Sequence, residues 1–600
     1  MSLVFRIYNN KEESPLKMKK YEKLINIISM VFAPVLIFYL FEWYMRNPFE
    51  KMNVSLQILN IFFFEFLLYF LIGIFGKIKV AIRVEAVLAI VVGLADYFVI
   101  QFRSTSIMPW DIFSIGTAAS VANNYKYHLN ARAVIVTILL LLIIVSCRWL
   151  KLTIGKKLPV RLLFVLAGFL MLFGFTKFIQ RDETVKTFRI YDKLFTPTTM
   201  SYKDGTVVAF LMEMKYMKVD KPANYSNEKA ETLLSTCENK NEITSNQPTP
   251  NVIVIMNEAF SDLSILDDYT TNTDEIPFMR FLMNNAENTV SGYMDVSVLG
   301  GNTANTEFEF LTGDSMAFLP QGSIPYQQYV NSDTSSLASY FKGLGYSTIA
   351  MHPYRAAGWD RDKVYPRFGF DQFYSQDDFT NPDILRKYIS DKADVDKIKE
   401  IYETKEKGTP LFLFNVTMQN HSSYTDSFDN FIPEISVENS DSEALNNYLS
   451  LLKKSDESLE DIITYFENQD EDTILVFFGD HQPTDSVVAP IYQMNGRSVY
   501  SLTEEETRMR YKVPFIIWAN YDIQEETNLT MSANLLGSKM LTVAGMQKGA
   551  YANYLSSLYT QFPSVSAMQI TDAAGKTTSV SEQKDLLSDY QMLQYYHLFQ

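Results

Sequence analysis

Cysteine and histidine are scarce in this chain of 600 residues, which contains two cysteines and five histidines. The cysteines, Cys147 and Cys237, lie far apart, so the sequence excludes both a disulfide framework and a Cys-x-x-Cys metal or redox motif. Positive charge is also in deficit, with 53 Lys and Arg against 69 Asp and Glu. Because phosphate contacts require clustered Lys and Arg, this balance argues against a nucleic-acid-binding protein.

The deficit of positive charge is confined to one part of the chain. Up to Asp220, 27 Lys and Arg face 15 Asp and Glu, whereas beyond it 26 face 54. A mass of 69.0 kDa also exceeds what one hydrophobic core usually supports. The sequence therefore predicts at least two structural units, the first basic and apolar and the second acidic.

Long apolar runs are concentrated in the first third of the chain. Each approaches the roughly 20 residues that cross the hydrocarbon core of a bilayer. No small-residue cleavage site closely follows the first run, so we expect a membrane anchor of five helices and no removable secretion signal. The five runs are Leu24 to Phe41, Leu56 to Phe75, Val80 to Phe102, Ala133 to Cys147 and Val160 to Phe175.

Basic residues near the ends of these runs predict the orientation of the chain in the membrane. They cluster before the first run, between the second and third, and between the fourth and fifth: Arg6, Lys11, Lys17, Lys19, Lys20, Lys23; Lys77, Lys79, Arg83; Arg148, Lys151, Lys156, Lys157, Arg161. By the positive-inside rule, all three segments face the cytoplasm. We therefore expect a multi-pass protein of the cell membrane whose chain beyond Phe178 is extracellular.

The boundaries of the expected organisation follow from composition. A transmembrane domain occupies residues 1–180, a juxtamembrane segment with a polar linker occupies 181–250, and an extracellular domain with a small C-terminal subdomain occupies 251–600. The stretch Thr187 to Met217 mixes Phe, Tyr, Met and Lys, which favours a position along the membrane surface.

Three carboxylates fall inside the apolar runs, namely Glu65, Glu85 and Asp96. Because a charge exposed to lipid is costly, each is a candidate functional residue. The alternative is that they pair with Arg83 or lie at an interface.

Four short, continuous apolar runs in the second part indicate strands buried on both faces of a parallel sheet. They are Val252 to Met256, Ser347 to Met351, Leu411 to Val416 and Ile474 to Phe478. Polar side chains follow every one of them: Asn257 and Glu258, His352, Asn420 and His421, and Asp480 and His481. Since the carboxyl ends of parallel strands meet at one edge, the sequence predicts an α/β domain with a mostly parallel central sheet and a site at that edge.

The types of these strand-end residues point to a metal ion. Asp480 and His481 can supply a carboxylate oxygen and an imidazole nitrogen to one cation, with Glu258 arriving from another strand. An oxygen-rich set with a single imidazole suits Mn²⁺ or Mg²⁺ at least as well as Zn²⁺.

A candidate nucleophile lies in the segment Gly300-Gly301-Asn302-Thr303-Ala304-Asn305-Thr306-Glu307-Phe308. We expect a helix to begin near Thr303, where the positive potential of the helix N-terminus and a nearby cation would favour ionisation of the hydroxyl. The alternative is that Thr303 is an ordinary N-cap.

A further cluster comprises His352, Trp359 and Arg361. Arg361 offers a planar fork for phosphate oxygens, and Trp359 offers a flat wall and an indole donor. The alternative is a surface loop with a stacked Arg–Trp pair. We expect the remaining acidic residues of interest to be solvated or capping charges: Asp262, Glu307, Glu309 and Asp470 to Asp472.

Five spans followed by these landmarks resemble the lipoteichoic acid synthases and related phosphoglycerol transferases, whose sulfatase-type domain belongs to the alkaline phosphatase superfamily. The landmarks, in order, are Glu258, Thr303 in its Gly-Asn-Thr segment, His352 through Arg361, Asn420-His421 and Gly479-Asp480-His481. The resemblance implies two groups of residues. Glu258, Thr303, Asp480 and His481 surround one divalent cation, Mn²⁺ in the first place and otherwise Mg²⁺ or Zn²⁺. His352, Trp359, Arg361 and His421 surround the glycerophosphate, with Thr303, Arg361 and His421 catalytic.

The implied function is transfer of glycerol phosphate from phosphatidylglycerol to lipoteichoic acid, a glycolipid or a polysaccharide, through a covalent phospho-threonine. One departure is Tyr354, which stands where lipoteichoic acid synthases commonly have an acidic residue, so the identity of the headgroup stays open. The alternatives are transfer of another phospho-headgroup such as phosphoethanolamine, hydrolysis of a phosphodiester, and a non-catalytic surface protein that keeps the fold.

Overall fold

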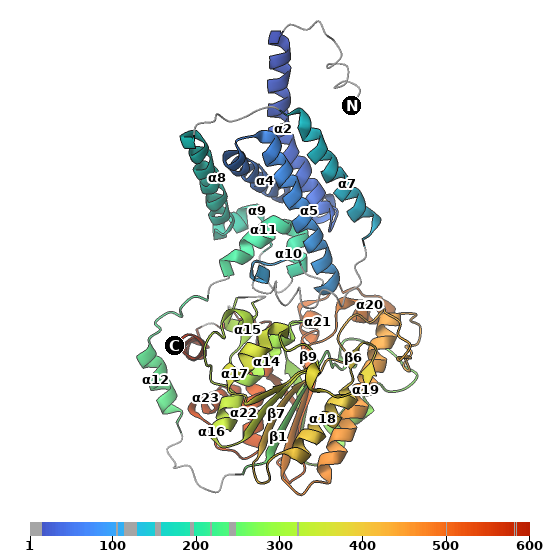
Figure 1. The fold of residues 1–600 in the computed structure, drawn as a ribbon. Helices are drawn as coiled ribbons and strands as arrows, with labels where there is room; N and C mark the ends of the chain where they lie inside the picture. Colours follow the sequence, from blue (N-terminus) through green and yellow to red (C-terminus); the bar gives the residue numbers. More distant parts are fainter. Residues whose placement is uncertain are drawn as a thin grey trace. The chain divides into compact units, whose positions relative to one another are not determined.

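The computed structural model describes residues 15–103, 106–112, 129–150, 158–191, 197–216, 219–238, 248–320, 323–499, 501–580, 582–583 and 585–600. These residues form two compact units, unit 1 up to residue 216 and unit 2 from residue 219 onward (Figure 1). The basic residues expected at the cytoplasmic face that lie outside the described residues are Arg6, Lys11, Lys151, Lys156 and Lys157.

Unit 1 is helical, and its five long helices coincide with the five apolar runs. They are α2 (Pro15–Trp43), α4 (Val54–Phe75), α5 (Ile78–Arg103), α7 (Ala131–Ser146) and α8 (Leu158–Ile179). Among the described residues, four stretches are long and apolar enough to cross a membrane: Leu24–Trp43, Val54–Phe75, Ala131–Trp149 and Leu158–Ile179. The third expected span, Val80 to Phe102, is the helix α5, which is not among these four stretches.

The interior of unit 1 contains the expected carboxylates. Glu85 and Asp96 on α5 are buried, and Asp96 accepts a hydrogen bond from the backbone N–H of Ile107 at 2.6 Å. Neither carboxylate oxygen of Glu85 has a hydrogen-bond partner among the described residues, and Nε of Arg83 donates instead to the carbonyl of Ile144. The pairing of Glu85 with Arg83 was therefore wrong.

Short helices complete unit 1: α3 (Pro48–Lys51), η1 (Pro109–Ile112), η3 (Cys147–Trp149), α9 (Asp182–Phe188), α10 (Pro197–Asp204), α11 (Thr206–Glu213) and η4 (Met214–Tyr216). α11 packs against α4 and α8, and most of its residues are buried. The stretch Thr187 to Met217 is thus largely helical, and its position along a membrane surface stays a prediction.

Unit 2 is built on an eight-stranded sheet of order β10-β2-β9-β8-β1-β7-β3-β4. The strands are β1 (Asn251–Asn257), β2 (Thr289–Asp295), β3 (Ser347–Met351), β4 (Gln372–Tyr374), β7 (Leu411–Val416), β8 (Thr473–Gly479), β9 (Lys512–Ala519) and β10 (Glu526–Ser532). Among these strands, β9 alone is antiparallel to its neighbours, and all other pairs are parallel. The expected mostly parallel sheet is confirmed, and the four expected strands form its adjacent strands β8, β1, β7 and β3.

Helices cover both faces of this sheet (Figure 1). Alternate residues of β1 enter different cores: Val252, Val254 and Met256 pack in one, and Ile253 and Ile255 in the other. The helices that pack in the first core are α14 (Thr303–Thr312), α15 (Pro325–Gln328), α16 (Leu337–Gly343), α17 (Arg361–Phe368) and α22 (Ala533–Val543). Those in the second are α13 (Pro277–Asn285), α18 (Asp391–Thr404), α19 (Glu443–Glu467) and α20 (Asp485–Met494).

The remaining elements of unit 2 are short. A hairpin pairs β5 (Ile384–Leu385) with β6 (Tyr388–Ile389), and a three-stranded antiparallel sheet combines β11 (Ser564–Val565), β12 (Ile570–Thr571) and β13 (Thr577–Thr578). The other helices are α12 (Asn227–Thr236), η5 (Leu263–Ile265), η6 (Met316–Phe318), η7 (Gly358–Asp360), η8 (Gln376–Asp378), α21 (Glu504–Met509), α23 (Ala550–Tyr559) and α24 (Ser588–Phe599).

Candidate active site

Four neighbouring strands deliver the expected polar residues to one edge of the sheet. Glu258 follows β1, His352 follows β3, His421 lies beyond β7, and Asp480 and His481 follow β8. Asn257 of β1 pairs in register with Gly479 of β8, so Glu258 and Asp480 leave the sheet at the same level. The parallel pairing of the strands therefore brings side chains together that lie more than 200 residues apart in the sequence.

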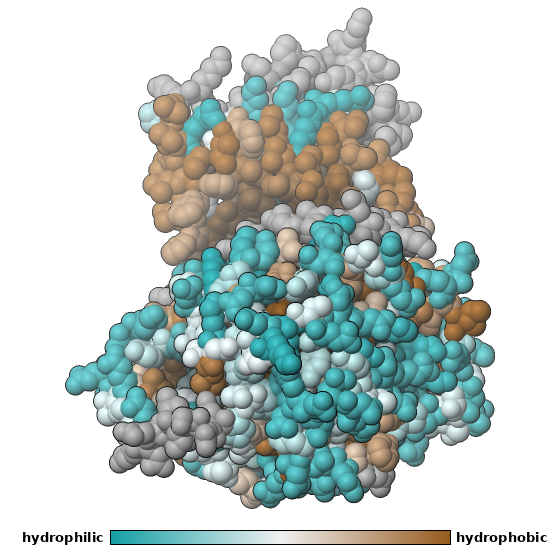
Figure 2. Space-filling view, turned by 60° about the horizontal axis from the view of Figure 1, so that its bottom comes forward, coloured by the Kyte–Doolittle hydropathy of each residue, from teal (hydrophilic) through white to brown (hydrophobic). Residues whose placement is uncertain are grey.

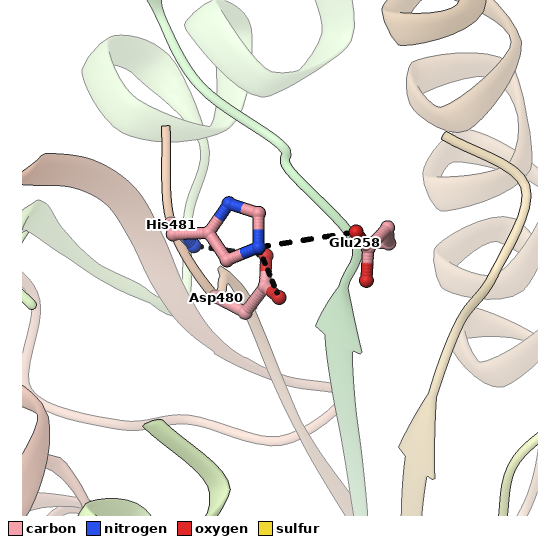
Figure 3. A group of neighbouring side chains, drawn as sticks. All are labelled: Glu258, Asp480 and His481. Carbon is pink, nitrogen blue, oxygen red and sulfur yellow. Dashed lines mark hydrogen bonds and ion pairs between the residues drawn. The ribbon is translucent and has the colours of Figure 1, made fainter. Parts of the chain in front are cut away.

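Glu258, Asp480 and His481 converge on one point (Figure 3). Each offers a ligand atom within 4.8 Å of the other two, and all three residues are buried. Nε2 of His481 lies 3.2 Å from Oδ2 of Asp480 and 3.9 Å from Oε1 of Glu258. Two carboxylates and one imidazole in this arrangement can hold a divalent cation.

Hydrogen bonds hold the side chains of Asp480 and His481 in place and leave one ligand atom of each unpaired. Oδ1 of Asp480 accepts the backbone N–H groups of Ala259 and His481 at 2.7 and 2.8 Å, and Nδ1 of His481 donates to the carbonyl of Gln482 at 3.0 Å. Oδ2 of Asp480 and Nε2 of His481 have no hydrogen-bond partner in the described part of the chain. Metal-binding histidines are usually oriented in this way through their second nitrogen.

The electrostatics of the cluster also favour a cation. Burial raises the pKa of Glu258 well above its usual range, and the nearby charge of Asp480 raises it further. A divalent cation among these groups would offset both effects. The residues present thus fit a divalent cation, and the donor set does not distinguish Mn²⁺ from Mg²⁺ or Zn²⁺.

Thr303 is the first residue of α14, as expected, and its hydroxyl lies beside the cluster. Oγ1 of Thr303 donates to Oε2 of Glu258 at 3.3 Å. The N-cap of α14 is Asn302, so Thr303 is not the capping residue. One turn later, Oγ1 of Thr306 donates to the carbonyl of Asp480 at 2.8 Å, which ties the start of α14 to the end of β8.

Left-handed backbone conformations adjoin several of the site residues. The φ angle is +52° at Ala259, next to Glu258, and +66° at Asn302, before Thr303. It is +57° at Trp359 and +58° at Asp360, directly before Arg361. Such conformations are unfavourable for residues other than glycine and gather at sites where position matters more than stability.

The imidazole rings of His352 and His421 are both uncharged at neutral pH, and each has one ring nitrogen that can accept a proton. Nδ1 of His352 donates to the carbonyl of Val416 at 2.8 Å, and Nδ1 of His421 donates to the carbonyl of Ser422 at 2.9 Å. Burial lowers the pKa of His421 to about 4, and burial with the charge of Arg361 lowers that of His352 well below its usual range. At neutral pH each therefore has an unprotonated Nε2 that can accept a proton.

Arg361 is buried and forms an ion pair with Glu307 of α14. Its Nε donates to Oε1 and Oε2 of Glu307 at 3.1 and 3.2 Å, and its Nη2 also contacts Oε1. Oε2 of Glu307 accepts the hydroxyls of Tyr326 and Tyr365 at 3.2 and 2.7 Å. One side of the expected phosphate-binding fork is therefore occupied by a carboxylate, and the remaining Nη1 lies 3.4 Å from the carbonyl of Gly358.

The expectation that Glu307 and Glu309 are solvated or capping charges was wrong. Both are buried because all ten residues of α14 are buried. Burial raises the pKa of Glu309 to about 8. Hydrogen bonds from the backbone of Met316 and the hydroxyl of Ser297 act in the opposite direction and lower this pKa. Asp262 does cap a helix, as expected: its Oδ1 accepts the backbone N–H of Ser264.

Two further residues near the edge were not foreseen. Arg386, in the β5–β6 hairpin, is buried and donates to the carbonyls of Gln419, His421 and Ser423 at 2.7, 2.7 and 2.8 Å. The hydroxyl of Tyr388 lies 3.3 Å from Nδ1 of His421. A two-residue strand has too few positions for a periodic signal, so nothing in the sequence marks either residue.

Trp359 is partly buried and packs against the first core.

Comparison with known proteins relates the chain to a family and to several curated relatives. Residues 250–546 match the sulfatase family. A Rhizobium meliloti protein named for cyclic beta-1,2-glucan modification is 30% identical over 416 residues, which cover 67% of this chain and 63% of the relative. The lipoteichoic acid synthase of Staphylococcus saprophyticus is 26% identical over 390 residues, which cover 62% and 57%. The match thus spans about three-fifths of the length of these relatives.

A solved structure shares the fold. The Streptococcus pyogenes phosphoglycerol transferase GacH, solved in complex with sn-glycerol-1-phosphate, superposes with a TM-score of 0.50 at 22% identity. The superposition covers 63% of this chain and 94% of that one.

Proposed function

Residues 250–546 form a sulfatase-family domain, and we propose that this domain transfers glycerol phosphate from phosphatidylglycerol to a cell-envelope acceptor, namely lipoteichoic acid, a glycolipid or a polysaccharide. The observation that carries this proposal is the convergence of Glu258, Asp480 and His481 beside the hydroxyl of Thr303. The likeness to a lipoteichoic acid synthase supports the choice of donor and acceptor.

In the first step, Oγ1 of Thr303 attacks the phosphorus of the phosphatidylglycerol headgroup. A bond forms between Oγ1 and phosphorus, and the bond from phosphorus to the diacylglycerol oxygen breaks. That oxygen takes up a proton from solvent as diacylglycerol leaves, which balances the proton given up by the Thr303 hydroxyl. The product on the protein is a glycerophospho-threonine. The hydrogen bond from Thr303 to Glu258 points the hydroxyl into the polar cluster and gives its proton an acceptor.

In the second step, an acceptor hydroxyl attacks the same phosphorus and displaces Oγ1 of Thr303. His421 is the residue best suited to take the proton of the entering hydroxyl, because its Nε2 is unprotonated at neutral pH. His352, which is also neutral, and Trp359 would line the side of the glycerophosphate. Arg361 would approach a phosphoryl oxygen through Nη1 while Glu307 fixes the plane of its guanidinium.

Glu258, Thr303, Asp480 and His481 would hold one divalent cation, Mn²⁺ in the first place and Mg²⁺ or Zn²⁺ otherwise. When bound, it would lower the pKa of the Thr303 hydroxyl and offset charge on the phosphoryl oxygens.

A second donor remains a candidate because of Tyr354. Its ring lies 6.2 Å from that of His352 and 6.1 Å from that of Tyr388, so an aromatic side chain borders the expected glycerol position. Phosphoethanolamine or another phospho-headgroup could be transferred by the same residues. Hydrolysis is distinguished by product, since a hydrolase releases free glycerophosphate without an acceptor.

The test uses the full-length protein in vesicles that contain phosphatidylglycerol labelled in its headgroup, with Mn²⁺ or with a chelator. We expect diacylglycerol release and an adduct of one glycerophosphate per chain in intact-mass spectra. Thr303→Ala should remove the adduct and lower turnover by roughly 1,000-fold or more, because the nucleophile is lost. Chelation should have a comparable effect that Mn²⁺ reverses.

Thr312→Ala is the matched control, since Thr312 lies at the other end of α14 and its hydroxyl bonds only within the helix and its cap. Diacylglycerol release by Thr303→Ala at the normal rate would contradict the proposed nucleophile. Turnover of phosphatidylethanolamine in place of phosphatidylglycerol would change the donor and leave the chemistry intact.

We further propose that unit 2 lies on the extracellular side, on the grounds of the basic residues between the apolar runs. An alkaline phosphatase reporter fused after Gln600 should be active, and one fused after Lys77 should be inactive. Equal activity of both fusions would refute this orientation.

A further inference from the structure

A second polar cluster lies inside unit 2, between the strands β1 and β7 and the helices α18 and α19. A cavity of about 10 Å³ is lined there entirely by buried residues. This volume is about what a single water-sized occupant requires. Its polar lining includes Asp391, Asp394, Asn415, Thr417, Ser455 and Ser458.

Two carboxylates face this cavity without a counter-charge. Asp391 and Asp394 lie one turn apart on α18 and are 2% and 1% exposed. Oδ2 of Asp391 accepts hydrogen bonds from Nδ2 of Asn257, at 2.7 Å, and from the hydroxyl of Ser455. Oδ1 of Asp391 and both oxygens of Asp394 have no partner in the described part of the chain. Burial, together with the charge of Asp391, holds the pKa of Asp394 well above its usual range.

An independent observation comes from Asn415 on β7. Its side chain is fully buried and lines the same cavity, where it faces Asp394 and partly offsets the rise in the pKa of that carboxyl. Neither Oδ1 nor Nδ2 of Asn415 has a partner at hydrogen-bonding geometry among the described residues. Native proteins rarely leave such groups unpaired, because each unpaired polar group costs about 1–3 kcal/mol. Five polar atoms from two elements are therefore unpaired around one small space.

We propose that this cavity is a second cation site, which takes one dehydrated, oxygen-coordinated ion of the Ca²⁺ type. The carboxylates of Asp391 and Asp394 and the side-chain carbonyl of Asn415 are its ligands. Mg²⁺ usually keeps several waters of hydration, and a space of this size does not hold them, whereas Ca²⁺ accepts irregular sets of protein oxygens. The site differs in chemistry from the Glu258 cluster because it contains no imidazole.

Hydrogen bonds connect this site to the catalytic edge. Asn257, which donates to Asp391, directly precedes Glu258. Nδ2 of Asn420, next to His421, donates to Oδ1 of Asn257 at 3.1 Å and to Oγ of Ser455 at 2.8 Å. The hydroxyl of Thr417 accepts the backbone N–H of Glu258 at 3.1 Å. An ion between α18 and β7 therefore fixes the ends of the two strands that carry Glu258 and His421.

The test measures calcium in the full-length protein in detergent, in an Asp480→Asn background that disables the first cluster. After equilibration with Ca²⁺ and desalting, elemental analysis should find one Ca²⁺ per chain. Adding Asp394→Asn should lower this to below one-tenth. Adding Asp396→Asn, the matched control, should leave it unchanged, because Asp396 is exposed on the same helix and pairs with Lys392. Ca²⁺ should also raise the melting temperature only where Asp394 is present.

Two further variants keep the proposal falsifiable. If Asp394→Asn fails to fold, Asn415→Ala, which retains both carboxylates, should bind Ca²⁺ at least tenfold more weakly. If Asp480→Asn fails to fold, the wild-type chain is compared with Asp394→Asn in excess Mn²⁺. Equal calcium in the presence and absence of Asp394 overturns the proposal. The proposal is also overturned if no calcium is found and the Asp394→Asn variant is as stable as its parent. In that case a proton on Asp394 satisfies the cluster. Neither readout depends on turnover, so the result stands apart from the proposed transferase activity.

Discussion

Unit 1 exposes many apolar side chains on its surface, whereas unit 2 keeps most of its apolar side chains in its interior. The large exposed hydrophobic residues of the described chain are concentrated in unit 1, whereas unit 2 exposes Phe281, Ile384, Ile432 and Leu586. Figure 2 shows the surface of unit 1 as largely hydrophobic and that of unit 2 as largely hydrophilic. The two surfaces therefore differ in polarity, so the buried interactions of the two units give the more direct comparison.

Each interior contains one Arg–Glu pair with the same exposure, 2% for the arginine and 0% for the glutamate. Glu42 of unit 1 lies in the last turn of α2, and Arg46 follows the end of that helix, four residues further along the chain. Arg46 also donates to the hydroxyls of Ser201 and Thr206. Arg361 and Glu307 of unit 2 join two different helices. The first pair therefore survives when the helices of its unit separate, and the second does not. We expect this difference in connectivity to decide how much each pair contributes to stability.

Removing Arg361 is the strongest test of this comparison. Arg361→Met leaves the charge of Glu307 buried with only the hydroxyls of Tyr326 and Tyr365, and loss of one partner of a buried pair costs about 3–5 kcal/mol. Hydrogen exchange in the full-length protein should report a loss of this size in α14 and α17, with turnover lost as well. The double variant Arg361→Met with Glu307→Gln should recover part of the stability and none of the turnover. Unchanged exchange in α14 would show that the pair does not hold the two helices together.

Arg361 also marks the limit of what the sequence could predict. The four strands β1, β3, β7 and β8 are continuous apolar runs, and the residues that follow them give the site its chemistry. Glu307 was missed because a helix buried on every side has no polar face, so its two glutamates look like surface charges. Pairing Glu307 with Arg361 requires the tertiary fold, which places residues 54 positions apart in contact.

Four strands of the main sheet were not predicted. β4 has only three residues, and β2, β9 and β10 were missed for other reasons. β9 contains Pro514, which is unusual inside a sheet, and β2 contains Gly292 and several polar residues. Gly292 is required by packing: a Cβ there would lie 2.1 Å from the carbonyl oxygen of Leu529 on β10. β2 does not carry the continuous apolar run on which the prediction relied, and β10 is partly exposed. β9 does carry such a run after Pro514, from Phe515 to Ala519, and it was not recognised.

Glu309 sharpens the comparison because it is a buried carboxylate in unit 2 that lacks a cationic partner. Its pKa of about 8 lies above that of an unfolded glutamate, so between about pH 4.5 and pH 8 the native state binds more protons than the unfolded state. The stability should therefore fall as the pH rises through this window and level off above it. Glu309→Gln should abolish that loss and exceed the wild type by a few kcal/mol at pH 8.5. Hydrogen exchange of α14 at pH 5 and pH 8.5 measures the difference; parallel pH profiles of the two proteins would contradict burial as the cause.

The smallest effect is expected for the pair in unit 1, when both charges are removed together. In Glu42→Gln with Arg46→Met, the new glutamine can still accept the backbone N–H of Thr206, a hydrogen bond that Glu42 makes at 2.8 Å. The double variant loses the contacts of Arg46 with Ser201 and Thr206, which are two hydrogen bonds from the segment after α2 to the helices α10 and α11. Hydrogen bonds between helices of membrane proteins contribute about 0.6 kcal/mol each on average, so we expect a loss of about 1 kcal/mol. Exchange should increase in α10 and α11 and stay unchanged in α2. A loss as large as that of Arg361→Met would mean that connectivity does not separate the two pairs, and that burial alone sets their contribution.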